Sequence, residues 1–285
     1  MARVRVLRAG VVSALVGLCC TAIVGSASAL AEGGSARYPN AIAVLGHSGA
    51  IGENSDPDRP GVVVRANSWA TGTNRAVNSV YLRILARNRL IKGHNFNLAQ
   101  GGATVGQLVN QATIAVPKLK PRPELFLVQI MDADIRCPAT EGNYTSFGST
   151  LVTALSALAK AAPSARIFVV SQFGSPLTYA RSLTPAERRT FGGTGPCDFV
   201  APDGAIVAKK AALLDEAIHG YEAQLKASCK RIRQCRYDDG AFGNIVDRRD
   251  YFSSDLNHFS IKGHAKAASV AWAAMKRAGI IPRTG

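Results

Sequence analysis

Residues 41–50 read Ala-Ile-Ala-Val-Leu-Gly-His-Ser-Gly-Ala, a short apolar run that ends in a turn of small residues. A continuous apolar run of this length is typical of a strand buried on both faces of a parallel sheet. We therefore expect residues 41–45 to form such a strand, with the turn at its carboxyl end.

Further short apolar runs alternate with segments of helical spacing. We expect strands at residues 96–99, 125–131 and 165–171, and helices at residues 77–88, 104–116, 146–161, 204–228 and 261–278. Strands that alternate with helices of crossover length indicate a parallel sheet covered on both faces. Such a sheet carries its functional side chains at the carboxyl ends of its strands.

One segment breaks this alternation. Residues 173–202 are rich in Gly, Pro, Ser and Thr and contain Cys197. The segment is too long for an ordinary connection within a compact domain. It either lies over the functional site or forms a plain surface insertion, and the sequence leaves both open.

The amino-terminal residues have the layout of a secretory signal peptide. Three arginines precede an apolar run at residues 11–24, and small residues suited to cleavage follow at Ala29 and Ala31. The run is short for a membrane span, and Leu18 stands where a lipoprotein signal needs a small residue. We expect residues 1–31 to be removed on export and residues 32–285 to form a single domain without a membrane span. An uncleaved anchor and a lipoprotein are the alternatives.

The chain is basic, with a formal net charge of +15 that falls to +12 when the three leader arginines are removed. The excess is spread out. Its densest points are Lys209-Lys210 and the pair Arg231 and Arg233, and no aromatic residues interleave with them. This pattern argues against a nucleic-acid-binding protein. A cationic exported protein suits an anionic cell envelope, which is the partner we expect besides a substrate.

Four cysteines follow the leader, at Cys137, Cys197, Cys229 and Cys235. An even number in an exported protein predicts two disulfides, for which three pairings exist. We favour Cys229–Cys235, which closes a short loop, together with Cys137–Cys197, which closes a long one. A metal site is the alternative, but there is no C-x-x-C motif and no neighbouring His pair. We expect no metal and no cofactor.

Ser48 follows the first expected strand, in Gly46-His47-Ser48-Gly49-Ala50. A small-residue turn at this place exposes a serine hydroxyl, and its backbone N–H groups can hold an oxyanion. The G-x-S-x-G motif of other hydrolases is not present, because position 50 is Ala. By itself the pattern is more typical of a serine that caps a turn.

A carboxylate and an imidazole stand three residues apart near the end of the chain, at Asp255 and His258. On a tight turn this spacing lets Asp255 accept a hydrogen bond from His258 Nδ1, which leaves Nε2 free to take a hydroxyl proton. A helix-capping aspartate beside a surface histidine is the alternative. Residues 97–104 and 131–135 add glycines and polar groups at the ends of two more expected strands. Along the chain, the four segments with functional side chains or N–H groups are thus those at Ser48, at residues 97–104, at residues 131–135 and at Asp255 with His258.

In that order the segments resemble the SGNH hydrolases, also called GDSL-type esterases and lipases. The family's Gly-Asp-Ser block matches Gly46-His47-Ser48, its N-x-A-x-x-G-A-T block matches residues 97–104, and its D-x-x-H block matches Asp255 and His258. The resemblance implies a catalytic triad of Ser48, His258 and Asp255, and an oxyanion hole from the N–H groups of Ser48 and Gly102. It also implies a flavodoxin-like, three-layer α/β/α sandwich with a five-stranded parallel sheet. Family members hydrolyse carboxylic esters of lipids, acetylated sugars or cell-envelope components without a metal or organic cofactor.

Two positions depart from the family's pattern. His47 replaces an Asp that takes no part in proton transfer, so we expect tuning of the site rather than its loss. Ala133 replaces the Asn of the family's G-x-N-D block, whose side chain completes the oxyanion hole. Losing one such donor costs roughly 10²–10³ in rate. Gln100 and Asn67 are the substitute donors that we consider.

Other polar and aromatic residues have simpler explanations. His264 lies on the last expected helix and is expected to be a packing or surface histidine. Asp132 and Asp134 stand two residues apart without a nearby His, so we expect structural carboxylates rather than a metal site. Trp69 either lines a pocket or packs in the core.

We therefore predict a secreted serine esterase, a carboxylic ester hydrolase that works through an acyl-enzyme intermediate. The alternative is a catalytically weak or inactive protein of the same fold that binds an envelope glycan or lipid. Ala133 and His47 motivate this alternative. Ligand binding without turnover of any ester would distinguish it.

Overall fold

The first strand lies where the sequence places it. In a computed structural model that describes residues 37–283, β1 (Ile42–Gly46) pairs with β2 (Asn95–Asn97) on one side and β3 (Leu125–Gln129) on the other. β4 (Arg166–Val169) and β5 (Cys235–Tyr237) complete a five-stranded sheet in the order β2-β1-β3-β4-β5. Every pairing is parallel. The predicted flavodoxin-like sheet is thus confirmed.

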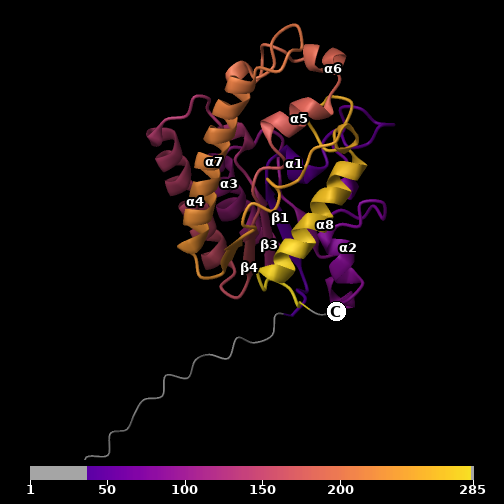
Figure 1. Cartoon of the computed structure of the whole chain (residues 1–285). Helices are drawn as coiled ribbons and strands as arrows, with labels where there is room; N and C mark the ends of the chain where they lie inside the picture. Colours follow the sequence, from indigo (N-terminus) through magenta and orange to yellow (C-terminus); the bar gives the residue numbers. More distant parts are fainter. Residues whose placement is uncertain (1–36, 284–285) are drawn as a thin grey trace, which may run out of the picture. The chain divides into compact units, whose positions relative to one another are not determined.

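Helices cover both faces of the sheet (Figure 1). The helices within residues 37–283 are α1 (Ser48–Ile51), α2 (Val80–Leu85), α3 (Val105–Asn110), α4 (Glu141–Ala161), α5 (Pro176–Ser182), α6 (Pro185–Arg189), α7 (Ala208–Lys230) and α8 (Ile261–Arg277). Of these, α5 and α6 lie beyond the end of the sheet rather than on its faces (Figure 1). Short 3₁₀ or π turns cover Arg65–Asn67, Arg89–Ile91, Gln111–Ala115, Val116–Lys118, Asp132–Asp134, Pro196–Asp198 and Arg249–Tyr251.

Alternate side chains of each strand supply two separate cores. Ala43 and Leu45 of β1 pack in one buried cluster with side chains of α3, α4 and α7. Ile42 and Val44 pack in the other, with side chains of α1, α2 and α8. A strand that is buried on both faces needs apolar residues at every position, which is why its sequence is a continuous apolar run. The predicted three-layer sandwich is confirmed.

Several element boundaries differ from the expected ones. α4 begins at Glu141, five residues before the expected start, because the Thr140 side chain accepts a hydrogen bond from the N–H of Asn143 and caps the helix there. β3 ends at Gln129 rather than at residue 131, and α7 begins at Ala208 rather than at residue 204. The strand β5 is only three residues long, too short for its periodicity to be seen in the sequence.

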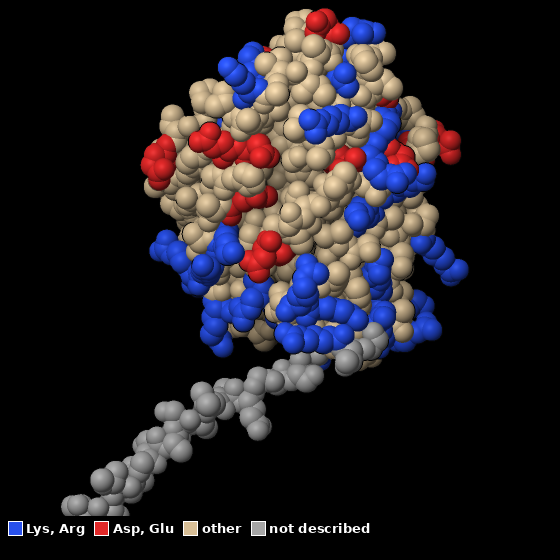
Figure 2. Space-filling model, in the orientation of Figure 1, with Lys and Arg blue, Asp and Glu red and all other residues tan. Residues whose placement is uncertain are grey.

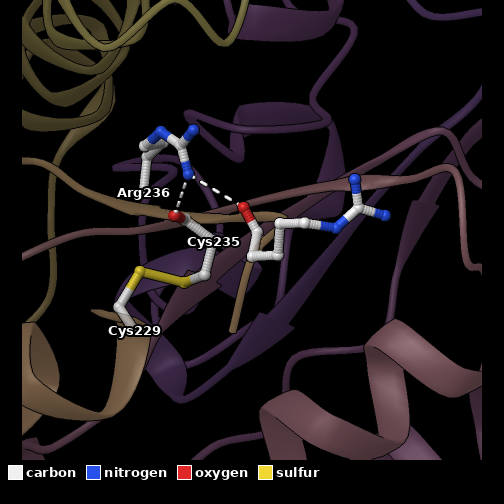
Figure 3. Close-up of a disulfide and its surroundings, with 4 residues drawn as sticks. Cys229, Cys235 and Arg236 are labelled. Carbon is white, nitrogen blue, oxygen red and sulfur yellow. Dashed lines mark hydrogen bonds between the residues drawn. A yellow bond between two sulfur atoms is a disulfide. The ribbon is translucent and has the colours of Figure 1, made fainter. Parts of the chain in front are cut away.

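Two disulfides join the elements in the pairing that we favoured. Cys229 at the end of α7 is bonded to Cys235 at the start of β5 (Figure 3), and Cys137 is bonded to Cys197. The Cα atoms are 5.2 Å apart in each pair. The first disulfide fixes the last strand to the helix that precedes it.

Residues 37–283 belong to one compact unit. None of the helices in this range is long and apolar enough to cross a membrane. The signal peptide predicted at residues 1–31 lies outside the described residues and stays a prediction.

The strand order fixes where a site can form. From β1 the chain passes outward to β2 and then returns to β3 on the other side, so β1 and β3 meet at a topological switch point. In open parallel sheets a crevice forms beyond the carboxyl ends of the strands at such a point. Gly46 ends β1 there with a φ of 126°, and a Cβ atom at this position would lie 1.7 Å from the carbonyl oxygen of Gln129. Only glycine allows this close approach, which brings Ser48 beside the end of β3.

Candidate active site

Ser48 is the first residue of α1, and His47 caps this helix. The Nδ1 atom of His47 accepts a hydrogen bond of 3.1 Å from the N–H of Gly49. Burial lowers the pKa of His47, so the ring is neutral at pH 7 and carries its proton on Nε2. The imidazole therefore acts as a helix-capping acceptor at the position where the SGNH hydrolases have an aspartate.

Two backbone N–H groups near the end of β1 and β2 have no acceptor among residues 37–283. They belong to Ser48, at the amino end of α1, and to Gly102, in the loop after β2. Gly102 is exposed and has a left-handed φ of 66°. Free N–H groups are the donors that an oxyanion hole requires.

Asp255 and His258 form the pair that the sequence predicts. Asp255 Oδ2 lies 2.7 Å from His258 Nδ1, and Asp255 Oδ1 accepts from the N–H groups of Asn257 and His258 at 3.0 Å each. The Ser253 hydroxyl donates to the same Oδ1. Burial acts to raise the pKa of Asp255, but the hydrogen bonds from His258, Ser253 and Asn257 outweigh it and hold this pKa well below its ordinary value. The carboxylate thus stays ionised and fixes the proton of His258 on Nδ1.

The loop that carries this pair is closed at its base. Phe252 and Phe259 form an antiparallel bridge, and the N–H of Ser253 donates to the carbonyl of His258 at 2.8 Å. Leu256, in the middle of the turn, has a φ of 60°, and its carbonyl accepts a hydrogen bond from the hydroxyl of Tyr179. Tyr179 belongs to α5, so the segment after β4 holds the histidine loop in place.

Ser48, Asp255 and His258 all line one cavity of about 480 Å³. Within residues 37–283, the Ser48 hydroxyl and His258 Nε2 do not form a hydrogen bond. The apolar wall of the cavity is made largely of aromatic side chains, which are Phe173, Tyr179, Phe191, Phe199, Phe252 and Phe259. Four of these six lie in residues 173–202, so this segment lies over the site rather than elsewhere on the surface.

The Cys137–Cys197 disulfide fixes the cavity wall. Cys197 lies between Pro196 and Phe199, which both line the cavity, and Cys137 follows Ile135, which lines it from the loop after β3. The bond therefore ties the segment over the site to the end of a central strand. An apolar wall held in this way gives the cavity a defined shape without a substrate.

Glu53 stands beside the histidine, although no pattern in the sequence points to it. Its Oε2 lies 3.8 Å from His258 Nε2 and is buried without a hydrogen-bond partner among the described residues. A Cβ atom on Gly101 would lie 2.6 Å from this oxygen, so Glu53 also contacts the loop that carries Gly102. A second carboxylate thus faces the imidazole on its Nε2 side, opposite Asp255.

Neither substitute donor that we considered is available in the cavity. The Asn67 side chain is buried and already forms hydrogen bonds with Ser55 and Asn74. The Gln100 side chain is exposed and is not among the residues that line the cavity. Gln129, at the end of β3, is the amide that the sequence analysis missed. Its Oε1 accepts a hydrogen bond of 2.7 Å from Trp69 Nε1, so its Nε2 is fixed as a donor against Gly49. A polar residue at the end of an apolar strand was the available signal.

The remaining polar residues of the sequence analysis have structural roles. Asp134 accepts from the N–H of Val105 at the start of α3, and burial raises its pKa to about 6. His264 is buried against Phe259, and burial lowers its pKa to about 3. Trp69 is a core residue. In the described part of the chain, no group of three or more His, Cys, Asp or Glu residues is arranged to hold a metal ion.

Met131, two residues after the end of β3, has an unusual backbone conformation. It stands where the family's block has glycine, and its φ is 143°. This conformation is strained for a residue with a side chain, and such residues gather at functional sites. The strained turn carries Asp132, which lines the cavity, and Ala133, which leaves the family's amide position without a donor.

Asp247 is a buried carboxyl at the edge of the cavity. Its Oδ2 accepts hydrogen bonds from the Thr178 hydroxyl and from the N–H of Ser175 at 3.2 Å, which fixes the start of α5. Its Oδ1 has no partner within residues 37–283. Burial raises the pKa of Asp247 to about 6, which the hydrogen bonds from Thr178 and Ser175 only partly offset.

Replacing Asp247 with asparagine is expected to stabilise the protein increasingly as the pH rises. The folded pKa of about 6 lies above the ordinary value of 3.8, so the stability that this carboxyl contributes is present below pH 3.8 and lost as the pH rises through 6. The asparagine side chain would keep an oxygen acceptor for Thr178 and Ser175 and would not ionise. The free energy of unfolding of Asp247→Asn relative to wild type should rise by up to about 3 kcal/mol between pH 4 and pH 7, measured in urea.

Asp250→Asn is the control for this measurement. The hydrogen bond from Arg248 lowers the pKa of Asp250, so ionisation of this residue favours the folded state. Its asparagine variant should therefore lose stability relative to wild type as the pH rises, which is the opposite sign. If the free energies of unfolding of wild type and Asp247→Asn changed with pH in parallel, the prediction that ionised Asp247 destabilises the folded state would be wrong.

Comparison with known proteins places this fold. No model of a known protein family matches the chain, and no curated protein sequence matches it. The solved structure of the salicylyl-acyltransferase SsfX3 from a tetracycline biosynthetic pathway has a TM-score of 0.51 at 14% identity, over 87% of this chain and 57% of that one. The fold is that of the SGNH hydrolases.

Two other solved structures have similar length. The lipase Lip_vut3 from a goat rumen metagenome has a TM-score of 0.48 at 12% identity, over 82% of this chain and 96% of that one. Phospholipase A1 from Streptomyces albidoflavus NA297 has a TM-score of 0.45 at 14% identity, over 82% of this chain and 98% of that one. Neither of these two likenesses supports a conclusion about the chemistry of this chain, which depends on the residues of the site.

Proposed function

We propose that the chain is a secreted serine esterase that hydrolyses carboxylic esters through an acyl-enzyme intermediate. The observation that carries the proposal is the 2.7 Å contact between Asp255 and His258 Nδ1, at a cavity that Ser48 also lines. A carboxylate that orients an imidazole at a cavity shared with a serine is the arrangement of a serine hydrolase. Acyl transfer, the activity of the salicylyl-acyltransferase SsfX3, belongs to the same class of chemistry.

The reaction would proceed in two steps. Ser48 Oγ attacks the ester carbonyl while its proton passes to His258 Nε2, and the tetrahedral intermediate collapses when the leaving alcohol takes that proton back. Water then attacks the acyl-enzyme by the same route and releases the acid and Ser48. Asp255 keeps the Nδ1 tautomer and stabilises the imidazolium in both steps. Glu53 lies close enough to add to this stabilisation.

The oxyanion would be held by two backbone donors and one side chain. The unpaired N–H groups of Ser48 and Gly102 supply the backbone donors. We assign the third donor to Gln129 Nε2, because Trp69 fixes its orientation and it lies against Gly49, next to the nucleophile. This donor would offset part of the loss caused by Ala133.

The cavity supports an ester with a bulky apolar group rather than an acetylated sugar. Six aromatic side chains line it, and its volume of about 480 Å³ is in the range of sites for small organic ligands. The Cys137–Cys197 and Cys229–Cys235 disulfides and the leader sequence at residues 1–31 support export to an oxidising compartment.

Fluorophosphonate labelling is expected to modify the folded wild-type protein at Ser48 in a 1:1 ratio. The probe reacts with a serine only where a base activates it and an oxyanion hole holds the phosphoryl oxygen. Mass spectrometry of the labelled peptide should locate the adduct on residue 48. Ser48→Ala should take up no label, and Ser253→Ala, which removes a serine in the same loop as His258, should still be labelled.

The alternative is a binding protein on the same fold, which Ala133 favours because it removes a family donor. A folded wild-type protein that takes up no fluorophosphonate and hydrolyses no p-nitrophenyl ester, yet still binds an apolar ester, would support this alternative. It would overturn the proposed esterase.

A further inference from the structure

The basic residues of this chain are concentrated at one edge of the sheet. In a parallel sheet the amino ends of all strands lie at one edge and the carboxyl ends at the other. Ser48 follows β1 and is therefore at the carboxyl edge. The segments that lead into the strands, and the end of α8, lie at the opposite, amino edge.

The connections into β2 and β3 are strongly basic. Residues 86–94, before β2, contain Arg87, Arg89 and Lys92, and residues 117–124, before β3, contain Lys118, Lys120 and Arg122. The side chains of Arg89, Lys92, Lys118, Lys120 and Arg122 are exposed. Glu124 is the only acidic residue in these two segments. Its side chain already accepts a hydrogen bond from Asn40 and forms an ion pair with Arg37.

The same pattern continues at the other strands. Three more segments contain basic residues and no acidic residue. Two of them, residues 159–166 and 230–236, lead into β4 and β5, and the third, residues 276–283, begins at the end of α8. Acidic residues instead follow two of the strands, as Asp132 follows β3 and Asp238 follows β5. Figure 2 shows the result, with Lys and Arg side chains crowded at the lower end of the molecule, where Figure 1 places the end of α8.

A recess of about 310 Å³ lies within this basic edge. Arg166, Arg233 and Arg236 line it, and no acidic residue does. The Arg236 guanidinium is held by the carbonyls of Arg233 and Cys235 beside the Cys229–Cys235 disulfide (Figure 3), and the Arg166 guanidinium by the carbonyl of Ile280. Fixed guanidinium groups with remaining N–H donors bind phosphate oxygens in a bidentate manner.

We propose that the amino edge is a docking surface for a linear phosphate-bearing polyanion, with one phosphate seated in the recess. Leu90 is the one strongly exposed large apolar side chain in the segments of this edge, so the surface has no apolar patch for insertion into a bilayer. Docking through this edge leaves the carboxyl edge, with Ser48, facing away from the polymer. The inference does not depend on the proposed esterase activity.

Binding to immobilised linear polyphosphate tests this surface directly. The wild-type protein should bind at 50 mM salt and lose at least roughly tenfold in affinity at 200 mM, because phosphate contacts release counterions. The triple variant Arg231→Gln, Arg233→Gln, Arg236→Gln should bind about 10- to 100-fold more weakly. Its thermal unfolding temperature should match that of wild type, which separates lost binding from lost folding.

A matched variant distinguishes a located surface from overall charge. Arg65→Gln, Arg75→Gln, Lys209→Gln also removes three exposed charges, but Arg65 lies next to the strand bridge after α1 and Lys209 at the amino end of α7. This variant should lose less than about threefold in affinity. Equal losses in both variants would overturn the proposal, as would binding to vesicles of anionic phospholipid without binding to polyphosphate.

Discussion

Replacing His258 with alanine is expected to lower kcat/KM on p-nitrophenyl esters by roughly 10⁴- to 10⁶-fold. In the proposed mechanism, the imidazole takes the proton of Ser48 and passes it to the leaving alcohol. Asp255 cannot replace it, because its carboxylate binds Nδ1, on the far side of the ring. Glu53 lies on the Nε2 side, but among residues 37–283 its Oε2 has no hydrogen-bond partner that would orient it toward Ser48.

The effect should fall on kcat far more than on KM, because substrate binding depends on the aromatic wall of the cavity. Asn257→Ala is the matched control, since Asn257 lines the same cavity beside His258 and its amide side chain cannot act as a general acid or base. It should change kcat/KM by less than about tenfold. A His258→Ala enzyme that keeps a tenth of the wild-type activity would rule out the proposed mechanism.

Asp255→Asn is expected to lower kcat by roughly 10³- to 10⁴-fold without unfolding the loop. The asparagine oxygen can still accept from the N–H groups of Asn257 and His258, but its amide group would face His258 Nδ1. The ring would then carry its proton on Nε2 and could not accept the proton of Ser48. Steady-state kinetics on a short p-nitrophenyl ester would measure the loss.

The control for this prediction is Ser253→Ala. Ser253 donates one hydrogen bond to Asp255 Oδ1, and in the described part of the chain its side chain forms no hydrogen bond with the imidazole ring, so its removal should lower kcat only a few-fold. Because the hydrogen bonds around Asp255 hold its pKa well below the ordinary range, the carboxylate should stay ionised at neutral and mildly acidic pH. Similar losses in Asp255→Asn and Ser253→Ala would mean that Asp255 only shapes the loop.

The basic edge adds a constraint on how such an enzyme meets its substrate. A polymer bound at the amino ends of the strands would hold the cavity open toward the medium rather than against the polymer. Substrates would then arrive from solution, and the anchored chain would keep its place by charge alone. Salt would release it without touching the chemistry at Ser48.

Local patterns predicted the parallel sheet with helices on both faces, and together with the resemblance to the SGNH hydrolases they singled out three candidate site residues. The continuous apolar runs at β1, β3 and β4 can be recognised because a strand buried on both faces needs an apolar residue at every position. Ser48 could be found because it follows such a run, and Asp255 and His258 because a spacing of three residues lets one turn join them. These contacts are close in sequence, or fixed by the direction of a strand.

Residues from distant parts of the chain were decided by the tertiary structure alone. Glu53 reaches His258, Gln129 is oriented by Trp69, and Asp247 holds α5, and each of these contacts joins segments that the sequence keeps far apart. The segment at residues 173–202 has no periodicity, so only packing against the histidine loop could show that it forms the cavity wall.

The sequence by itself thus determined the layers of the sandwich, the place of Ser48 at the end of β1 and the pairing of Asp255 with His258. Each depends on periodicity or on short spacing, which a single chain displays. Only the tertiary structure decided what surrounds Ser48, because burial and orientation depend on neighbours that meet through the order of the strands. The same order gathered basic residues from five separate segments onto one edge.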